Sequence, residues 1–321
     1  MLIASIAIII GLALLVWSAD KFVEGASGIA KNFQVPPIII GLTIVSLCTS
    51  LPEMLVALLA ALDGSNNLGI GNAIGSNIAN IGLVLGITAL VAPLAVQSKV
   101  LKREYPVLFL IMILALVLMI DGALSVWDGV ILLVGLVLLI LWLLRLGLSE
   151  RDAVLEAEFE DVIPKNADMK SSILWFTIGL IVLLASSKIV VWGAVEIATL
   201  LGVSDLVIGL TIVAIGTSLP ELVASIVSVL KNEAELAIGN VIGSNMFNIL
   251  AVLSMPALFA PGNFDGQTLT RDLPVMFIFT VLLFLVAYGF RKAGRINRVE
   301  GGLLLSGYVG YMYVLFLQSA S

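Results

Sequence analysis

Long apolar runs recur along this chain and decide what it can fold into. A helix needs about 20 apolar residues to cross the hydrocarbon of a bilayer, and such runs, separated by charged or Gly/Pro-marked turns, predict ten spans. Apolar residues make up 60% of the 321 positions and charged residues 12%, so a water-soluble globule could not cover itself with polar surface. We therefore predict an all-α polytopic membrane protein. The expected spans cover residues 2–19, 36–62, 69–92, 105–121, 127–146, 172–192, 205–230, 236–260, 273–290 and 300–318.

Two residue types are scarce, and their scarcity limits the chemistry. The chain has one cysteine, Cys48, which excludes an internal disulfide and a thiolate cluster for a soft metal. It has no histidine, which removes the usual proton carrier at neutral pH and the commonest ligand of transition metals. Any ion site must therefore be built from oxygen atoms.

The distribution of basic residues predicts the orientation. Cytoplasmic loops accumulate Lys and Arg. With the N-terminus outside, all of the 16 Lys and Arg except Lys188 and Arg271 fall on the cytoplasmic side. The run from Leu2 to Trp17 could be a signal peptide, but it lacks a basic stretch ahead of it and a later segment mirrors it, so we expect a retained helix. We expect an integral protein of a prokaryotic plasma membrane with both termini outside.

The two halves of the chain repeat each other at a distance of 168 positions. Residues 40–53 match residues 208–221 at 11 of 14 positions, and residues 71–80 match 239–248 at 7 of 10. Because each unit has five predicted spans, an odd number, the second unit enters the membrane from the opposite side. Two inverted five-helix repeats are a transporter architecture, since exchanging the conformations of the halves exchanges the side from which a site is open. A duplicated scaffold without transport is the alternative.

The repeat predicts the organisation of the chain into units. The first five-helix repeat is expected over residues 1–146 and the second, inverted one over 172–321. Residues 147–171 between them are polar and rich in Asp and Glu, and are expected to form a solvated cytoplasmic linker rather than an acidic ion site.

The most strongly repeated stretch is also the least suited to lipid. It places Glu53 in the second span and Glu221 in the seventh, each within a Thr-Ser-Leu-Pro-Glu motif. A carboxylate at the bilayer centre costs about 2.5–3.5 kcal/mol on insertion scales, so two of them need compensation, which a bound cation supplies. Two proline kinks in a polar helix interface are the alternative.

Proline accounts for the rest of the motif. Pro52 deprives the carbonyl of Cys48 of its helical partner, and Pro220 does the same to Gly216, so we expect spans two and seven to be broken. Non-helical backbone at membrane depth survives only where it lines a cavity or is buried in protein. The hydroxyl oxygens within one turn of the glutamates belong to Thr49, Ser50, Thr217 and Ser218. This hard, anionic oxygen set suits Ca²⁺ or Na⁺.

Spans three and eight are expected to supply the other wall of the site. They contain the segments Gly-Asn-x-x-Gly-Ser-Asn, in which polar residues four apart share one helix face. The stripes consist of Asn72, Ser76 and Asn80 and of Asn240, Ser244 and Asn248. Asn77 and Asn245 lie on another face, and we expect them to form interhelical hydrogen bonds.

At these residues the chain resembles the sodium/calcium exchangers of the cation/calcium antiporter superfamily, whose repeats carry GTSLPE followed by GN-x-x-GSN-type segments. The resemblance implies a prokaryotic exchanger with ten helices, four cation subsites in a diamond and no cofactor. It implies that Glu53 and Glu221 are central ligands and that the first and sixth helices slide across the core. The further ligands that it implies are the oxygens of Thr49, Ser50, Thr217, Ser218, Ser76 and Ser244 and the carbonyls of Ser46 and Ala214.

Two positions depart from the family pattern. Cys48 stands where the first motif usually has glycine, and Asn248 where many of these exchangers have aspartate. The site then contains at most two carboxylates, which balance one Ca²⁺ or two Na⁺, whereas a third Na⁺ would leave net positive charge in a low-dielectric site.

We accordingly predict a monomeric secondary antiporter, not an enzyme, that exchanges Na⁺ against Ca²⁺ and has small inorganic cations and the lipid bilayer, but no nucleic acid, as partners. Coupling to H⁺ or K⁺, transport of Mg²⁺ or Mn²⁺, and a cation channel remain alternatives. An intramembrane enzyme is disfavoured because the sequence has no paired aspartates for protease chemistry and no nucleophile with a base, and because the membrane lysine Lys188 is expected near a span end.

Overall fold

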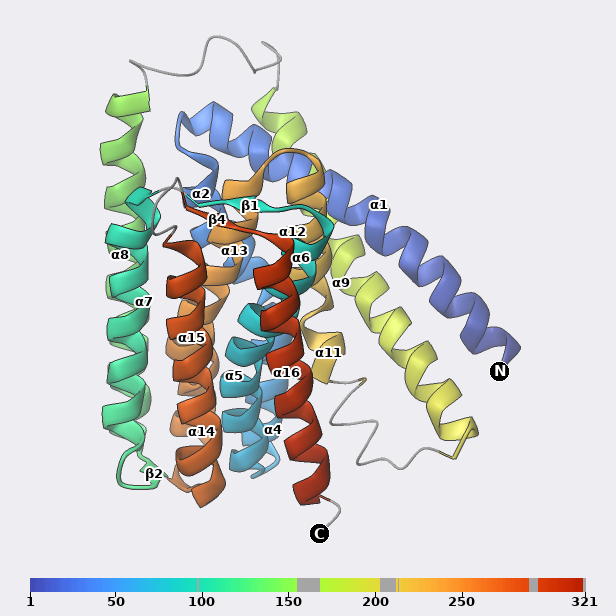
Figure 1. The fold of residues 1–321 in the computed structure, drawn as a ribbon, viewed down its shortest axis with the longest axis vertical. Helices are drawn as coiled ribbons and strands as arrows, with labels where there is room; N and C mark the ends of the chain where they lie inside the picture. Colours follow the sequence, from blue (N-terminus) through green and yellow to red (C-terminus); the bar gives the residue numbers. More distant parts are fainter. Residues whose placement is uncertain (97, 155–167, 203–211, 213, 289–293, 320–321) are drawn as a thin grey trace.

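The computed structural model describes residues 1–96, 98–154, 168–202, 212, 214–288 and 294–319, and side chains are described at all of these except 98–101, 150–154, 214 and 319. The described chain is almost entirely helical (Figure 1), as predicted for a polytopic membrane protein. It contains 7 helices long and apolar enough to cross a membrane, or up to 8 if one bent pair counts as a span. These helices cover Leu2–Phe33, Asn66–Val91, Val126–Ser149, Met169–Leu200, Ala234–Phe259, Thr268–Ala287 and Arg298–Gln318.

The helices and strands occur in two successive series that correspond to the two predicted repeats. The first series is α1 (Leu2–Phe33), α2 (Pro37–Ile40), η1 (Gly41–Val45), α3 (Ser46–Thr49), α4 (Leu51–Leu62), α5 (Asn66–Ala79), η2 (Asn80–Leu85), α6 (Gly86–Val91), β1 (Leu94–Ala95), α7 (Ser98–Met119), β2 (Ala123–Leu124) and α8 (Val126–Val154). The second is α9 (Met169–Leu200), α11 (Ala214–Thr217), α12 (Leu219–Leu230), α13 (Ala234–Phe247), η4 (Asn248–Val252), α14 (Ser254–Phe259), β3 (Gly262–Asn263), η5 (Thr268–Asp272), α15 (Leu273–Ala287), β4 (Arg295–Ile296) and α16 (Arg298–Ser319). Elements labelled η are π-helices.

The boundaries of the elements repeat at the same spacing as the sequence. Helices α3, α4 and α5 begin and end 168 positions before α11, α12 and α13. Similarly, η2 begins 168 positions before η4, and an asparagine is the first residue of both π-helical segments. The duplication seen in the sequence is thus a duplication of local backbone structure.

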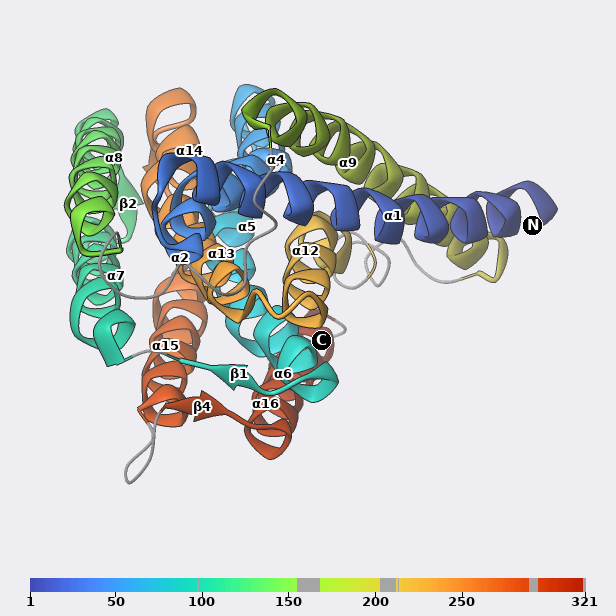
Figure 2. The ribbon, with the colours of Figure 1, turned by 90° about the horizontal axis from the view of Figure 1, so that it is seen from above.

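The corresponding helices α1 and α9 run in opposite directions. Gly11 lies against Val190, whereas Gly25 lies against Phe176, so residue numbers rise along one helix as they fall along the other. Glycine is needed at this contact, because a Cβ at Gly25 would come within 2.3 Å of the Phe176 amide nitrogen. Figure 2 shows the two helices as a long pair beside the remaining helices. The antiparallel pairing is what inverted repeats require.

Two short antiparallel ladders join the repeats. Strand β1 pairs with β4, and β2 pairs with β3. Each ladder joins a loop of one repeat to a loop of the other, and Figure 1 places β1 and β4 in the upper part of the molecule and β2 at its lower end. Between the two ends, one hydrophobic core combines side chains of both repeats, among them Ile74 and Ile242.

Several expected boundaries were wrong. The first span was expected to end at residue 19, but α1 continues to Phe33 and ends where Gln34 adopts left-handed backbone angles ahead of two prolines. The sixth was expected to end at residue 192, but α9 continues to Leu200, so Lys188 lies inside the helix and not near its end. Helices α8 and α9 also extend into the expected linker, and residues 155–167 of it lie outside the described residues.

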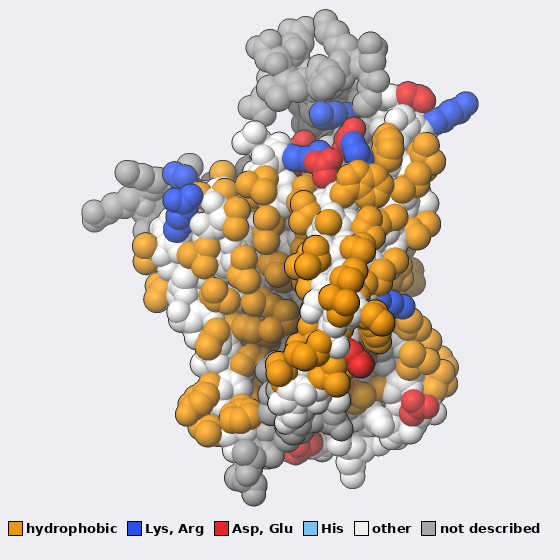
Figure 3. Space-filling model, turned by 90° about the vertical axis from the view of Figure 1, so that its right-hand side faces the viewer, with side chains coloured by type: hydrophobic (Ala, Val, Ile, Leu, Met, Phe, Trp, Pro, Cys, Tyr) orange, Lys and Arg blue, Asp and Glu red, His pale blue; other side chains and the backbone are white. Residues whose placement is uncertain are grey.

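The surface of the molecule is apolar over most of its height. Figure 3 shows one face covered largely by hydrophobic side chains, with most of the Lys and Arg side chains toward the end that lies at the top. The exposed apolar side chains include Ile9, Val16, Ile181 and Trp192 on the α1–α9 pair. Such a surface is matched to lipid, and the protein is an integral membrane protein.

Candidate functional site

The helix carrying each Thr-Ser-Leu-Pro-Glu motif is interrupted at the serine. Helix α3 ends at Thr49 and α4 begins at Leu51, and α11 and α12 are divided in the same way around Ser218. Proline fits the first turn of a helix because its missing N–H needs no partner there. The segments Pro37–Thr49 and Leu51–Leu62 are bent by 41° relative to one another. The proline therefore starts a new helix and places the glutamate in its first turn.

Glu53 and Glu221 are buried together. Each is 1% exposed, and each lies in the first turn of its helix, α4 or α12. The two carboxylates lie close enough for the charge of Glu221 to repel that of Glu53. The Oε2 atom of each has no hydrogen-bond partner among the described residues. Two buried and incompletely paired carboxylates are unfavourable alone, and a cation between them would offset that cost.

Hydrogen bonds from the first repeat reach the second at this point. The Ser50 hydroxyl donates to Oε1 of Glu221 at 3.4 Å. The Thr49 hydroxyl donates to Oδ1 of Asn240 at 3.1 Å. Thr49 and Ser50, which were predicted site residues, are thus brought together with the second glutamate, although 171 positions separate Ser50 from Glu221.

An asparagine of each repeat holds the backbone of the glutamate in the same repeat. The Asn72 amide donates to the carbonyl of Glu53 at 2.9 Å, and the Asn240 amide donates to the carbonyl of Glu221 at 3.4 Å. The Asn240 amide also donates to the Ser225 hydroxyl at 3.2 Å. The polar stripe indicated these asparagines, but the sequence did not indicate that they support the glutamates, and it gave no signal for Ser225.

The stripe residues further along α5 and α13 are buried polar groups. Ser76 is 5% exposed and Ser244 0%, and no hydrogen bond among the described residues joins either to a glutamate. Asn80 donates to Oδ1 of Asn245 at 3.2 Å, across the two repeats. Asn248 is 1% exposed, and its amide oxygen and nitrogen have no partner among the described residues. Such groups in an apolar core call for water or an ion.

Two asparagines differ in the bonds that they make. Asn245 was expected to bond between helices, and its bond from Asn80 confirms this. Asn77 was expected to do the same, but its amide donates to the carbonyl of Ala73 on its own helix at 2.9 Å. A short polar side chain can return to the backbone one turn before it, and no described residue of a facing helix competes for this amide.

The remaining predicted ligands lie along the broken helices. The Ser46 carbonyl accepts hydrogen bonds from the Ser50 N–H at 3.0 Å and the Thr49 hydroxyl at 3.4 Å, so an ion at this oxygen would compete with the hydroxyl. Ser218 is buried and its hydroxyl has no partner among the described residues, and Thr217 is half-buried. Ala214 is the first residue of α11 and borders residues outside the described part.

A serine of α9 reaches the second break and was not predicted. The Ser187 hydroxyl donates to the carbonyl of Gly216 at 3.2 Å, which is the carbonyl that Pro220 frees. The same position of α1 holds Ala19, which has no hydroxyl to donate in this way. A side chain of the long helix pair therefore contacts the backbone beside the site.

Most of the polar atoms around the two glutamates that could ligate a cation are oxygens, and few are amide nitrogens. Among the described residues, no group of three or more His, Cys, Asp and Glu could hold a metal ion. The site therefore combines two carboxylates with hydroxyl, amide and carbonyl oxygens, as the sequence indicated. Oxygen ligands with a charge of about two select hard cations such as Ca²⁺ and Na⁺ over soft metals.

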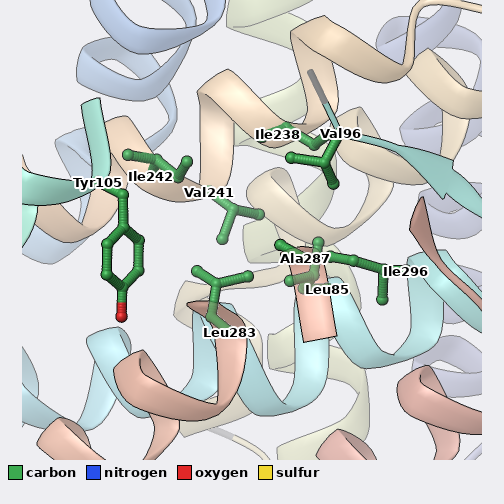
Figure 4. A pocket seen from close by; sticks show the side chains of 9 residues that line it. All are labelled: Leu85, Val96, Tyr105, Ile238, Val241, Ile242, Leu283, Ala287 and Ile296. Atoms are coloured by element: carbon green, nitrogen blue, oxygen red, sulfur yellow. The ribbon is translucent and has the colours of Figure 1, made fainter. Parts of the chain in front are cut away.

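Two cavities away from the site, both formed by residues that the structure describes, have apolar linings and do not compete as ion sites. A cavity of about 10 Å³ lies among Leu85, Val241, Leu283 and their neighbours. In Figure 4 the side chains around it are hydrocarbon except for the hydroxyl of Tyr105, which donates to the carbonyl of Thr280. Because that hydroxyl is already hydrogen-bonded, the cavity lacks the two or more polar partners that a buried water molecule or an ion needs.

Comparison with known proteins identifies relatives over nearly the whole chain. The sodium/calcium exchanger protein family matches residues 3–145 and 171–317. The chain is 48% identical to the putative antiporter CaxA of Alkalimonas amylolytica over 98% of this chain and 99% of that protein. It is 30% identical to the sodium/calcium exchanger MaX1 of Methanosarcina acetivorans over 96% and 97%.

Solved structures of the sodium-calcium exchanger NCX_Mj have the same fold. For crystals soaked with Na⁺ and Sr²⁺, the TM-score is 0.82 at 37% identity, covering 98% of this chain and 99% of that one. For crystals soaked with Na⁺ and Ca²⁺, it is 0.83 at 35% identity, covering 98% of both chains.

Proposed function

This chain belongs to the sodium/calcium exchanger family, and from that premise we propose that it exchanges Na⁺ against Ca²⁺ by alternating access at the site around Glu53 and Glu221. Proteins of this family are transporters of small inorganic cations. The ions compete for the same oxygens, and only a charge-balanced site crosses between the two access states.

One observation carries this proposal. The glutamate of each repeat is buried, and the Ser50 hydroxyl of the first repeat contacts the carboxylate of Glu221 in the second. A cation bound between the glutamates would therefore touch both repeats at once. Since movement of one repeat against the other exchanges access in inverted-repeat transporters, such a cation is placed to couple its own binding to that movement.

Charge balance sets the expected stoichiometry. Two carboxylates balance one Ca²⁺ or two Na⁺, and Asn248 contributes no third charge. Opposite charges in a low-dielectric site attract each other strongly, and excess charge there is correspondingly unfavourable. We therefore expect one Ca²⁺ to exchange for two Na⁺. The ligands of these ions would be the oxygens of Glu53, Glu221, Thr49, Ser50, Thr217, Ser218, Ser76, Ser244, Asn80 and Asn248 and the carbonyls of Ser46 and Ala214.

The proposal includes an orientation and a functional unit. The excess of Lys and Arg on one side favours both termini outside and a cytoplasmic linker in a prokaryotic plasma membrane. The side chains of the site come from a single chain, so a monomer embedded in lipid would be sufficient for transport.

Purified protein in lipid vesicles tests the proposal. An outward Na⁺ gradient should drive uptake of ⁴⁵Ca²⁺, and Glu53→Gln or Glu221→Gln should abolish it. The matched control is Glu196→Gln, which removes an exposed carboxylate of α9 and should leave uptake unchanged. Absence of uptake by the wild type would contradict the assignment of Ca²⁺.

The same vesicles distinguish the other forms of cation transport. Replacing the Na⁺ gradient with a H⁺ or K⁺ gradient tests the coupling ion, and competition with Mg²⁺ or Mn²⁺ tests the substrate. Flux without any counter-ion gradient would indicate a channel.

A further inference from the structure

A salt bridge joins the long helix pair to the broken helix of the second repeat. The Lys231 ammonium lies 2.7 Å from Oδ1 of Asp20. Asp20 lies in α1, and Lys231 follows the last residue of α12. The side chains of Lys231 and Asp20 are 31% and 42% exposed, so this is a partly solvated pair at the surface of the molecule.

The repeat gives this pair a counterpart with the charges exchanged. The position 168 residues after Asp20 is Lys188 in α9, and the position 168 residues before Lys231 is Asp63 after α4. We call Lys188 and Asp63 the mirror pair. Each repeat thus contributes one acid and one base at equivalent positions, but the acid of one repeat corresponds to the base of the other.

Of these two pairs, the structure contains the one between Asp20 and Lys231. Among the described residues, neither Lys188 nor Asp63 takes part in a salt bridge, and both side chains are exposed. The packing of the described helices has the same asymmetry: α1 packs along α12, whereas α9 makes no comparable contact with α4. The structure therefore holds the helix pair toward the end of the molecule where α12 terminates (Figure 1).

Geometry prevents both pairs from forming together. Gly11 lies beside Val190 and Gly25 beside Phe176, which places Lys188 level with Ala13. Ala13 is seven positions from Asp20, or about 10 Å at 1.5 Å per helical residue.

Their partners lie much further apart. Helices α4 and α12 have 12 residues each, or about 18 Å, and lead from the breaks toward opposite ends of the molecule (Figure 1). Asp63 and Lys231 are thus separated by roughly 36 Å along the axis of the molecule if both helices are straight. The roughly 36 Å between Asp63 and Lys231 exceeds the ~10 Å between Asp20 and Lys188 by about 26 Å. Lysine and aspartate side chains cannot bridge that difference, so only one of the two pairs can form at a time.

We propose that Asp20, Lys231, Lys188 and Asp63 are positioning residues for the transport step: the Asp20–Lys231 bridge forms in one access state and the mirror pair in the other. The inference rests on the proposed alternating access, in which the repeats exchange conformations. When they do so, the contact of α1 with α12 becomes a contact of α9 with α4, and the charges of the mirror pair meet.

The position of Lys188 supports this role. Helix α9 has 32 residues, and Lys188 lies well inside it, among exposed apolar side chains such as Ile189 and Trp192. A basic residue inside a membrane helix is unfavourable and is retained where it has a partner in some state. The mirror pair supplies that partner at Asp63.

Zero-length cross-linking of the protein in vesicles tests the proposal. A carbodiimide joins a lysine to a carboxylate that touches it, and mass spectrometry quantifies each product. In Cys48→Ser protein, which retains no native cysteine, the Asp20→Cys/Lys231→Cys pair is closed with a flexible bismaleimide, which adds to both thiols without an oxidant. We expect this closure to lower the yield of the Lys188–Asp63 product at least tenfold. Closure of the Asp63→Cys/Lys188→Cys pair should remove the Lys231–Asp20 product equally.

In the Asp63→Cys/Lys188→Cys protein, which keeps Asp20, Lys21 and Glu24 provide the matched control, because they pair within α1 at 2.7 Å and have no charged counterparts in α9. Proteins with a substitution at Asp20 do not serve for this control, because Lys21 also lies 3.8 Å from the Asp20 carboxylate. Their product should stay constant throughout. Persistence of the Lys188–Asp63 product after closure of the other pair would overturn the proposal. So would its absence from wild-type protein under every ion gradient.

Charge exchange separates pairing from a general effect of substitution. Lys231→Ala should raise the Lys188–Asp63 product about two- to fivefold, the scale expected of a partly exposed ion pair. The double substitution Asp20→Lys/Lys231→Asp should restore the wild-type yield. Equal yields in all three proteins would contradict the proposal.

The yields of the two cross-linked products depend on the positions of the helices and not on which ion the protein transports. Loss of their reciprocity while Na⁺-driven Ca²⁺ uptake persists overturns the paired bridges alone. Reciprocity without Ca²⁺ uptake supports the bridges and overturns the ion assignment.

Discussion

The hydroxyl of Ser50 lies 3.4 Å from Oε1 of Glu221, so a side chain of the first repeat contacts the carboxylate of the second. Both residues are almost fully buried, at 0% and 1% exposure. The two broken helices therefore meet at their breaks, which is where each has polar side chains and backbone that the regular helix does not satisfy.

Ser50→Ala tests this contact. Removal of the hydroxyl takes away one oxygen of the proposed site, and we expect the apparent affinity for Ca²⁺ to fall about fivefold, the equivalent of about 1 kcal/mol for one hydrogen bond. Concentration dependence of ⁴⁵Ca²⁺ uptake measures it. Ser306→Ala, which removes an exposed hydroxyl that donates to the Gly302 carbonyl of its own helix, is the control. Equal affinities in the two variants would place Ser50 outside the site.

Asn240 and Asn72 occupy equivalent positions but differ in their bonds. Asn240 binds the Glu221 carbonyl, Ser225 and Thr49, whereas the Asn72 amide binds the Glu53 carbonyl alone among the described residues. Asn240→Ala should cost about 1–3 kcal/mol, because it leaves several buried groups unpaired. Asn72→Ala should cost less. Thermal unfolding in detergent compares them, and a larger loss for Asn72→Ala would contradict this account of the network.

Gly239 and Gly71 also correspond, and their surroundings differ. A Cβ at Gly239 would come within 2.6 Å of the Ile38 carbonyl, whereas at Gly71 it would meet no described atom within 4 Å. Gly239→Ala should therefore destabilise this arrangement by about 1–3 kcal/mol, as overpacking does. Gly71→Ala should not lower the thermal midpoint, because alanine favours a helix by about 1 kcal/mol over glycine. Similar losses in the two variants would refute the difference in packing.

Asn248 limits the charge of the proposed site. Asn248→Asp adds a third carboxylate where the amide is buried without a partner among the described residues. If only a charge-balanced site crosses the membrane, three Na⁺ balance the variant site, whereas one Ca²⁺ leaves it with net negative charge. Na⁺/Na⁺ exchange should then persist while Na⁺-driven Ca²⁺ uptake slows, which parallel uptake of ²²Na⁺ and ⁴⁵Ca²⁺ measures. Undiminished Ca²⁺ uptake in a folded variant would show that charge balance does not control which loaded site crosses.

Sequence patterns alone predicted much of this architecture. The apolar runs predicted an α-helical membrane protein, and the 168-residue repeat predicted the correspondence of the helices. The segment Thr49–Glu53 indicated the broken helix, because proline at this position forces a new helix start. The family resemblance is confirmed by relatives that cover nearly the whole chain. The ligand roles of the site residues stay predictions.

Other features depend on contacts between distant segments. The bond from Ser187 to the Gly216 carbonyl joins two helices, and no local pattern marks one serine among several in α9. The interhelical hydrogen bond expected of Asn77 was wrong, because the sequence shows which helix face carries Asn77 but not which residues of a neighbouring helix lie opposite it. The ends of α1 and α9 were placed too early because the apolar runs were read as ending at charged or glycine positions, such as Asp20 and Gly193, although both helices continue beyond them.

The central claim is that Glu53 and Glu221 share one cation site for which Na⁺ and Ca²⁺ compete. Equilibrium binding of ⁴⁵Ca²⁺ to the purified protein, at increasing Na⁺ concentrations, tests it most directly. We predict one Ca²⁺ per chain, competitive displacement by Na⁺, and loss of binding in both Glu53→Gln and Glu221→Gln but not in Glu196→Gln. Undiminished, Na⁺-sensitive binding in either glutamine variant would contradict it.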